Sequence, residues 1–375
     1  MKFILNIFIF IGVSFFLFTG CSSKIEQKPQ ISQANMKKVD WEDLEGFEAD
    51  DLNRSLKVFV KDCVNSISDD TLTLVCQSAK IAEDGKSFFK SNFTPYQLID
   101  DEGDEDGLIT GYYEPTLNGS YYQTKRYKYP IYEVPNDLLT IDMTTAYAEL
   151  KKYKLRGKFK NNKIIPYDTR ETIENKDFRT DVNLKPICFV DDKIDLFFLH
   201  IQGSGRVLLE NGKIINVGYG AQNGRKYYSI GRKLIEIGAI KKEDVSLQTI
   251  REWLIKNPKE ADEVMNLNES YIFFNKNSKL ATGSLGTQLT PLRNLAVDRD
   301  MIPLGFPVFL NTTNPITEEP INQLMIAADT GGAIKGKIRA DLFFGGDDKA
   351  EALAGKMKEK GMLYILVPNE NEIVE

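Results

Sequence analysis

The sequence predicts a mainly β protein with a few helices and enough length for two domains. Between residues 118 and 215, short apolar stretches alternate with turns, and one turn holds Asn211-Gly212, a dipeptide typical of β-hairpins. Strand-like apolar runs return from Tyr271 onward. At about 150 residues per domain, a chain of 375 residues suits two domains.

The expected elements follow from the spacing of apolar residues. After Asp50-Asp51, the residues Leu52, Leu56 and Phe59 recur at intervals of three or four, which predicts a helix. Further helices are expected at 229–237, 243–255, 261–267 and 349–358. Strands are expected at 129–132, 194–202, 207–209, 271–274, 307–310, 324–328, 342–344 and 363–367.

The composition narrows the classes of function. The formal net charge is -6, and an acidic chain is a poor partner for a nucleic-acid polyanion. The chain holds one histidine, His200, whereas an HExxH zinc site needs two. An apolar, strand-like stretch surrounds His200, which favours a hydrogen-bonded structural side chain. The net charge of -6 is compatible with a neutral or zwitterionic glycan as the ligand.

The first residues are typical of an exported lipoprotein. A short charged start precedes an apolar run from Phe3 to Phe18, so residues 1–20 are expected to be a signal peptide. The small residue before Cys21 resembles a bacterial lipobox, whose cysteine is lipidated; a plain transmembrane anchor is the alternative. The serine after Cys21 resembles the sorting signal for the outer membrane, and residues 21–39 suit a polar tether. We therefore expect a periplasmic protein anchored to the outer membrane.

Three further cysteines, Cys63, Cys76 and Cys188, lie in apolar stretches. Export would permit a disulfide, and Cys63 with Cys76 is the nearest pair along the chain. Buried free thiols fit the same stretches equally well. The sequence therefore leaves the disulfide state open.

Two ligand-binding motifs are incomplete. Residues 331–337 match the front of a phosphate-binding loop, but Ile338 stands where a magnesium-binding Ser or Thr should be. In the acidic loop that begins at Asp100, the residues Glu102, Asp104, Asp106 and Gly107 have the spacing of an EF-hand. The first position, Glu102, is not Asp, and the twelfth is Tyr113 rather than Glu. We therefore expect neither a nucleotide site nor a calcium site.

One polar turn, 201–206, offers groups that suit a sugar. Gln202, Ser204 and Arg206 carry hydrogen-bond donors for hydroxyls and amides, and glycines such as Gly203 let a ligand approach the backbone. A hairpin turn without a ligand fits the same residues. The two interpretations stay open at this point.

Two neighbouring aromatics, Tyr112 and Tyr113, lie at the end of a strand-like run in Gly111-Tyr-Tyr-Glu-Pro115. Aromatic rings at such a place could stack on sugar faces. Core packing is the favoured interpretation.

Three aspartates, Asp298, Asp329 and Asp341, each adjoin an apolar strand-like run. A partly buried carboxyl group can have a raised pKa, which permits general acid catalysis near neutral pH. A structural hydrogen-bonding role for all three is the alternative.

Several fragments along the chain, together with these aspartates, occur in a recognisable order. They are Gly111-Tyr-Tyr-Glu-Pro115, Tyr167-Asp-Thr-Arg-Glu171, Ile201-Gln-Gly-Ser-Gly-Arg206, Gly218-Tyr-Gly-Ala-Gln-Asn-Gly224, Ser229-Ile-Gly-Arg232, Ser270-Tyr-Ile-Phe-Phe274 and Leu295-Ala-Val-Asp-Arg-Asp-Met-Ile-Pro-Leu-Gly305. This combination resembles the membrane-bound lytic murein transglycosylase A family. The last fragment and residues 324–345 resemble the family's small module that is named for its three aspartates.

The resemblance implies a fold. It predicts a double-psi β-barrel made of residues 40–115 and 267–375, with the three-aspartate module inside it. A second, β-rich domain is expected as an insertion at 116–266, and a glycan groove is expected at the junction.

The resemblance also implies site residues. Asp341 matches the catalytic acid, and Asp329 matches the aspartate beside it. Because a nearby cation would oppose a raised pKa, we expect Lys335 and Arg339 to point away from Asp341. The expected substrate-binding residues are Thr110, Tyr112, Tyr113, Gln202, Gly203, Ser204, Arg206 and Asp298.

The activity implied by the resemblance is lytic cleavage of peptidoglycan glycan strands. The β-1,4 bond between N-acetylmuramic acid and N-acetylglucosamine is cut, and the C6 hydroxyl closes a 1,6-anhydro ring. One aspartate can serve as acid and then base, and no metal or organic cofactor is expected. A muramidase-type hydrolase and a non-catalytic peptidoglycan-binding lipoprotein are the alternatives. Other cell-wall enzymes are possible partners.

Overall fold

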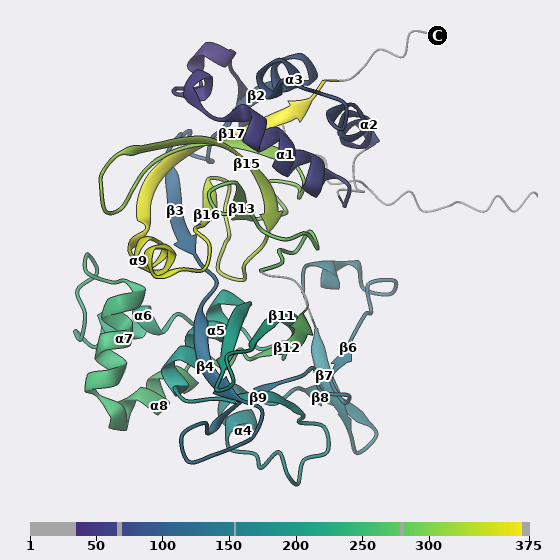
Figure 1. The fold of residues 1–375 in the computed structure, drawn as a ribbon. Coiled ribbons are helices and arrows are strands. Elements are labelled where there is room, and N and C mark those ends of the chain that lie inside the picture. Colours follow the sequence, from purple (N-terminus) through teal and green to yellow (C-terminus); the bar gives the residue numbers. More distant parts are fainter. Residues whose placement is uncertain (1–34, 66–69, 154, 278–280, 370–375) are drawn as a thin grey trace, which may run out of the picture.

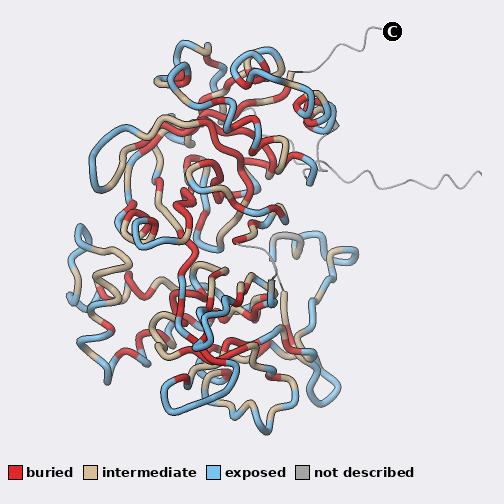
Figure 2. Tube along the Cα trace, in the orientation of Figure 1, coloured by how far each residue is buried: buried red, intermediate tan, exposed pale blue. Residues whose placement is uncertain are grey.

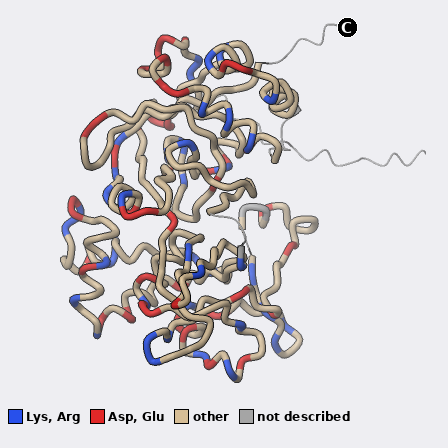
Figure 3. Tube along the Cα trace, viewed as in Figure 1, with Lys and Arg blue, Asp and Glu red and all other residues tan. Residues whose placement is uncertain are grey.

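The computed structural model describes residues 35–65, 70–153, 155–277 and 281–369, which form two stacked bodies (Figure 1). The predicted signal peptide and Cys21 lie outside the described residues. Within the described ranges, no helix is long and apolar enough to cross a membrane. Basic and acidic segments are interspersed over both bodies (Figure 3).

The upper body is a barrel, and its sheet has eight strands. Six of them form a ring in the order β17-β14-β15-β13-β16-β3, which a pairing between β17 and β3 closes. The pairings of β13 with β15 and of β16 with β3 are parallel. The strands are β1 (Met36–Lys38), β2 (Phe93–Leu98), β3 (Gly107–Tyr112), β13 (Asn294–Val297), β14 (Pro307–Thr313), β15 (Pro320–Asp329), β16 (Arg339–Phe343) and β17 (Lys358–Pro368).

Burial explains the continuous apolar runs in the ring strands. Residues 308–310 of β14 and 324–328 of β15 are fully buried. Successive stretches of β17 pair with β3, β14 and β2, so this one strand joins the ring to the outer strands. The buried runs form the red centre of the upper body in Figure 2.

Three helices cover one end of the barrel: α1 (Leu52–Cys63), α2 (Asp70–Ala79) and α3 (Gly85–Asn92) (Figure 1). The Asp51 carboxylate caps α1 by accepting a hydrogen bond from the Arg54 N–H at 3.0 Å. Cys63 and Cys76 form a disulfide between α1 and α2, which resolves the choice that the sequence left open. Cys188 is free and buried.

The lower body is built on a sheet in the order β12-β11-β10-β4-β9-β5. A three-stranded sheet flanks it, and the helices α6, α7 and α8 pack together on one side (Figure 1). The elements are β4 (Thr116–Ser120), β5 (Tyr129–Tyr132), β6 (Leu139–Thr140), β7 (Arg156–Lys160), β8 (Lys163–Pro166), α4 (Arg170–Glu174), β9 (Pro186–Val190), α5 (Lys193–Gln202), β10 (Gly205–Leu209), β11 (Ile214–Gln222), α6 (Ile230–Glu236), α7 (Leu247–Lys256), α8 (Pro258–Asn266) and β12 (Ile272–Asn277).

The lower body extends further along the chain than residue 266, where the insertion was expected to end. Strand β12 pairs with β11 from Gln222↔Ile272 to Asn216↔Asn277. Its residue Phe273 is buried in a core cluster of the lower body. The lower body therefore includes β12, and the chain returns to the barrel after it.

The prediction of a strand at 194–202 is wrong, because this segment is the helix α5. The Asp192 carboxylate caps the helix by accepting from the Ile194 N–H at 2.7 Å, and the helix ends at Gly203, whose φ is 78°. A helix that is buried on most sides shows no polar stripe, so its apolar run resembles that of a buried strand. The predicted helices at 229–237, 243–255, 261–267 and 349–358 are confirmed as α6, α7, α8 and α9 (Asp348–Lys356).

His200 on α5 is a buried structural residue, as its apolar surroundings predict. Its Nδ1 accepts a hydrogen bond from the Arg170 guanidinium at 2.8 Å, and its ring stacks on Phe274. Burial lowers the pKa of His200 well below its ordinary value, and the Arg170 charge lowers it further. The imidazole is therefore neutral in the folded protein.

Candidate active site

Asp341 lies on the face of the barrel wall that points away from the main core. Its neighbours on β16, Ala340 and Leu342, are fully buried in that core. Because side chains alternate along a strand, Asp341 projects to the other side, where its side chain is 19% exposed.

The strand register places the two predicted site aspartates in one row. Asp341 pairs with Thr110 on β3 and with Ala296 on β13, and Ala296 in turn pairs with Asp329 on β15. The small side chain of Ala296 therefore stands between the two carboxyl groups. At about 4.8 Å per strand, the Cα atoms of Asp329 and Asp341 lie about 10 Å apart.

The Asp341 carboxylate contacts two side chains on its own face. Its Oδ1 accepts hydrogen bonds from the Thr110 hydroxyl and from Arg339 Nη1, and Arg339 Nη2 also donates to Thr110 Oγ1 at 2.8 Å. The prediction that Arg339 points away is therefore wrong. Residues 339 and 341 share one face because the side-chain period of a strand is two. Lys335 does point elsewhere.

Asp329 is held by three hydrogen bonds at the end of β15. Its Oδ1 accepts from the Ser284 N–H at 2.9 Å, from the Ser284 hydroxyl at 2.8 Å and from the Thr330 N–H at 2.8 Å. Loss of hydration raises the pKa of Asp329, and these hydrogen bonds oppose the rise. Its contacts tie the start of the glycine-rich turn to residue 284.

Asp298 lies outside the row. It is buried, and its carboxylate accepts from Lys335 Nζ at 2.9 Å and from the Gly336 N–H at 3.1 Å. These contacts explain why Lys335 is turned away from Asp341. They hold the end of the glycine-rich turn against the loop after β13.

The segment Tyr113–Pro115 runs from the barrel strand β3 to β4 of the lower body. The Tyr113 N–H donates to Gln202 Oε1 at 3.2 Å, and the Arg206 N–H donates to the Pro115 carbonyl at 2.8 Å. Arg206 Nε also lies 3.5 Å from the carboxylate of buried Glu114. The polar turn 201–206 is thus fastened to the chain that joins the two bodies.

The same segment reaches the end of β16. The Glu114 N–H donates to the Gly345 carbonyl at 2.7 Å, and the Phe344 N–H donates to the Tyr112 carbonyl at 3.0 Å. One short crossing segment at the junction of the two bodies therefore bonds both to the polar turn and to the end of β16, the strand that carries Asp341.

Comparison with known proteins decides the family. The MltA specific insert domain matches residues 108–275, and the 3D domain matches residues 293–367. MltA from Neisseria gonorrhoeae is 33% identical, with a TM-score of 0.74 over 90% of this chain and 92% of that chain. This chain belongs to the membrane-bound lytic murein transglycosylase A family.

Other relatives agree. The structure of the membrane-bound lytic murein transglycosylase from Agrobacterium tumefaciens is 30% identical, with a TM-score of 0.81 over 89% of this chain and 98% of that chain. Membrane-bound lytic murein transglycosylase A from Vibrio cholerae is 29% identical over 274 residues, which are 70% of this chain and 67% of that protein. The predicted fold class, a double-psi β-barrel with a second β-rich domain, is confirmed by these matches. The chain is accordingly an enzyme of the lytic transglycosylase class.

In this member of the family, Tyr112 and Tyr113 pack against other side chains, which is the interpretation that the sequence favoured. The Tyr112 ring lies 5.1 Å from the Phe343 ring, and Tyr113 is buried. Burial raises the pKa of Tyr112 well above its usual value, and the charges of Asp329 and Asp341 raise it further. The Tyr112 side chain therefore lies close to both aspartates.

Within the polar turn, Gly203 faces open space. Its backbone has a positive φ of 78°, and a Cβ added there would meet no atom within 4 Å. Ser204 is partly buried beside it. This stretch of backbone is accessible to a ligand from the outside.

Sequence reasoning missed Tyr227, which comes from the lower body. Burial raises its pKa, and the negative charge of Asp341 contributes to the rise. Tyr227 of the lower body therefore lies within electrostatic range of Asp341. Tyr227 lies just before the recognised fragment Ser229–Arg232, but nothing in its local pattern distinguishes it from a core tyrosine.

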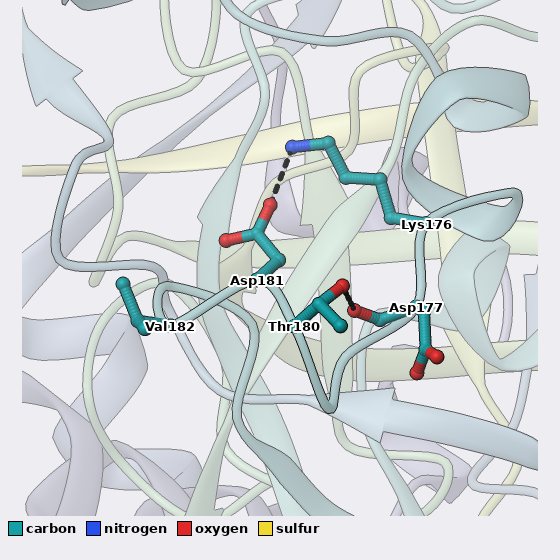
Figure 4. Close-up of a pocket in the computed structure, with 5 residues that line it drawn as sticks. All are labelled: Lys176, Asp177, Thr180, Asp181 and Val182. Atoms are coloured by element: carbon teal, nitrogen blue, oxygen red, sulfur yellow. Dashed lines mark hydrogen bonds and ion pairs between the residues drawn. The ribbon is translucent and has the colours of Figure 1, made fainter.

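A separate hollow of about 380 Å³ lies in the lower body, as Figure 4 shows. Lys176 and Asp181 pair across it at 2.8 Å, and Asp177, Thr180 and Val182 complete its lining. None of the predicted site residues borders this hollow. Among the described residues, no group of three His, Cys, Asp or Glu side chains could hold a metal ion.

Proposed function

We propose that this enzyme cleaves the β-1,4 bond between N-acetylmuramic acid and N-acetylglucosamine in peptidoglycan and leaves a 1,6-anhydromuramoyl end. Asp341 is the acid and then the base. The observation that supports this role is its position: a partly exposed carboxylate on the non-core face of the barrel, beside small Ala296 and within electrostatic range of Tyr227 of the lower body. Glycan strands therefore bind at the junction of the two bodies.

The proposed reaction uses one carboxyl group twice. Protonated Asp341 gives its proton to the glycosidic oxygen while the bond from that oxygen to C1 of the muramic residue breaks. The C6 hydroxyl of the same residue forms the new bond to C1, and its proton passes to the Asp341 carboxylate. Intramolecular attack lowers the entropic cost, and no water is consumed.

The surroundings of Asp329 favour this reaction over hydrolysis. A hydrolase that inverts the anomeric centre needs a second carboxylate, roughly 6.5 to 9.5 Å from the acid, to activate water. Asp329 is the other carboxylate of the row, but its Oδ1 already accepts three hydrogen bonds. We assign it to holding the turn.

The decisive experiment compares Asp341→Asn with the wild type on purified sacculi. We expect Asp341→Asn to fold normally and to release at least about a thousand-fold less anhydro-muropeptide, because it loses the general acid. Asp300→Asn is the matched control, since Asp300 is exposed on the turn after β13.

Mass spectrometry of the wild-type products separates the alternatives. Products that carry an added water and a reducing muramic end would indicate a hydrolase. Binding to sacculi without soluble product would indicate a non-catalytic lipoprotein. Activity of Asp341→Asn close to that of the wild type would contradict the assignment of Asp341.

We further propose that Cys21 carries a lipid that anchors the enzyme to the outer membrane on its periplasmic side. The lipobox-like sequence supports this, and so does the membrane-bound character in the relatives' names. Cys21→Ala should abolish incorporation of labelled palmitate and shift the protein to the soluble fraction. Unchanged labelling would contradict the anchor. Recruitment by other cell-wall enzymes would follow from the same location.

A further inference from the structure

Arg339 is the one charged side chain seen bonded to the Asp341 carboxylate in the described structure. We propose that Arg339 is a positioning residue: together with Thr110 it holds the Asp341 carboxylate in the single orientation needed for proton transfer to the glycan. This inference rests on the proposed role of Asp341.

The geometry fixes the guanidinium independently of the carboxylate. Arg339 Nη1 donates to the Ala340 carbonyl at 2.7 Å, and its side chain is only 15% exposed. Its Nη2 donates to the Thr110 hydroxyl at 2.8 Å. A planar fork held by a backbone carbonyl and a hydroxyl presents the second N–H of Nη1 to Asp341 in a fixed direction.

Thr110 completes the arrangement from the neighbouring strand. It stands directly opposite Asp341 in the parallel pairing of β3 with β16, and its hydroxyl contacts both the Asp341 carboxylate and Arg339. A freely rotating Asp side chain has several rotamers, whereas this closed set of three groups selects one.

Other charged and titratable groups around Asp341 do not replace Arg339. Asp329 and Tyr112 face it from β15 and β3, and Tyr227 faces it from the lower body. Lys358 on β17 stands opposite Thr110 in the antiparallel pairing, but its Nζ donates to the Lys242 carbonyl at 3.1 Å. Arg339 is therefore the cation that bears directly on the charge of Asp341.

The consequence for the reaction is that one fixed carboxyl group serves both proton transfers. After the proton is donated, the Arg339 cation stabilises the carboxylate that must next accept the C6 hydroxyl proton. Arg339 thus keeps the carboxylate fixed and stabilised within each turnover.

The test separates kcat from KM on a soluble oligomer of alternating N-acetylglucosamine and N-acetylmuramic acid. The kcat of Arg339→Gln should fall about ten-fold with little change in KM, because the carboxylate is no longer held in the orientation for proton transfer. Arg299→Gln is the control of equal charge change, since Arg299 is exposed.

Arg339→Lys separates charge from geometry. Lysine keeps the positive charge but lacks the planar fork, so we expect the KM of the wild type with a reduced kcat. If Arg339→Gln does not fold, Arg339→Lys carries the test by itself.

Three results would overturn the inference: an unchanged kcat in Arg339→Gln, an equal loss of kcat in Arg299→Gln, or full kcat in Arg339→Lys. Activity of Asp341→Asn would instead contradict the proposed function, so the two failures are distinguishable.

Discussion

At the scale of single residues, the two aspartates of the row differ in what surrounds them. Asp341 shares a partly exposed face with Arg339 and Thr110, whereas Asp329 is bound to backbone and hydroxyl donors from residues 284 and 330. A carboxylate that accepts from backbone N–H groups of two segments is suited to holding a turn. One that is bound by side chains alone is suited to moving a proton.

This difference predicts how Asp329 affects stability. Asp329→Asn keeps an oxygen for all three hydrogen bonds, so it should fold. Asp329→Ala leaves the Ser284 and Thr330 N–H groups unpaired and should cost about 1–3 kcal/mol of stability.

The pH dependence of stability follows from the burial of Asp329. Because burial raises the pKa of Asp329, the folded protein binds a proton there more readily than the unfolded chain does. Stability should therefore fall as pH rises from the ordinary Asp pKa through the raised value.

Urea unfolding at a series of pH values measures both effects. Asp329→Asn should lack this contribution to the pH dependence and should retain most of the activity on sacculi. A loss of activity as large as that of Asp341→Asn would show that Asp329 takes part in catalysis instead.

At the scale of elements, the sequence predicted what depends on local pattern. The helices α1 and α6 to α9 carry apolar residues at helical spacing, and the strands β14, β15 and β17 carry continuous apolar runs, so their positions could be predicted. Helix α5 was missed because burial removes the polar stripe that distinguishes a helix from a strand.

Pairing between distant segments could not be predicted in the same way. The row that links Asp329, Ala296 and Asp341 depends on the register of three strands, including a shift between Leu295 and Ala296. Nothing in the local sequence specifies that register. The contact of Arg339 with Asp341 follows from strand periodicity once residues 339–343 are known to be a strand, so this error could have been avoided.

At the scale of the whole molecule, the barrel and the lower body meet where the polar turn 201–206 touches the crossing segment. The pair of Arg206 with buried Glu114 belongs to this contact, and the backbone of Gly346 lies against it. Burial raises the pKa of Glu114, and the Arg206 charge opposes that rise. The relative placement of Asp341 and the turn therefore depends on a small, closely packed contact.

Gly346→Ala tests whether this contact matters for activity. A Cβ at position 346 would lie 2.6 Å from Arg206 Nη2 and 3.1 Å from the Glu114 carbonyl oxygen, so the guanidinium must move. Leaving buried Glu114 without its partner should cost about 1–3 kcal/mol of stability. Because the turn would shift relative to Asp341, we expect KM for the soluble glycan oligomer to rise several-fold with a smaller change in kcat. Gly332→Ala is the control, since a Cβ there meets no atom within 4 Å. An unchanged KM in Gly346→Ala, or an equal rise in both variants, would mean that the turn does not contribute to glycan binding.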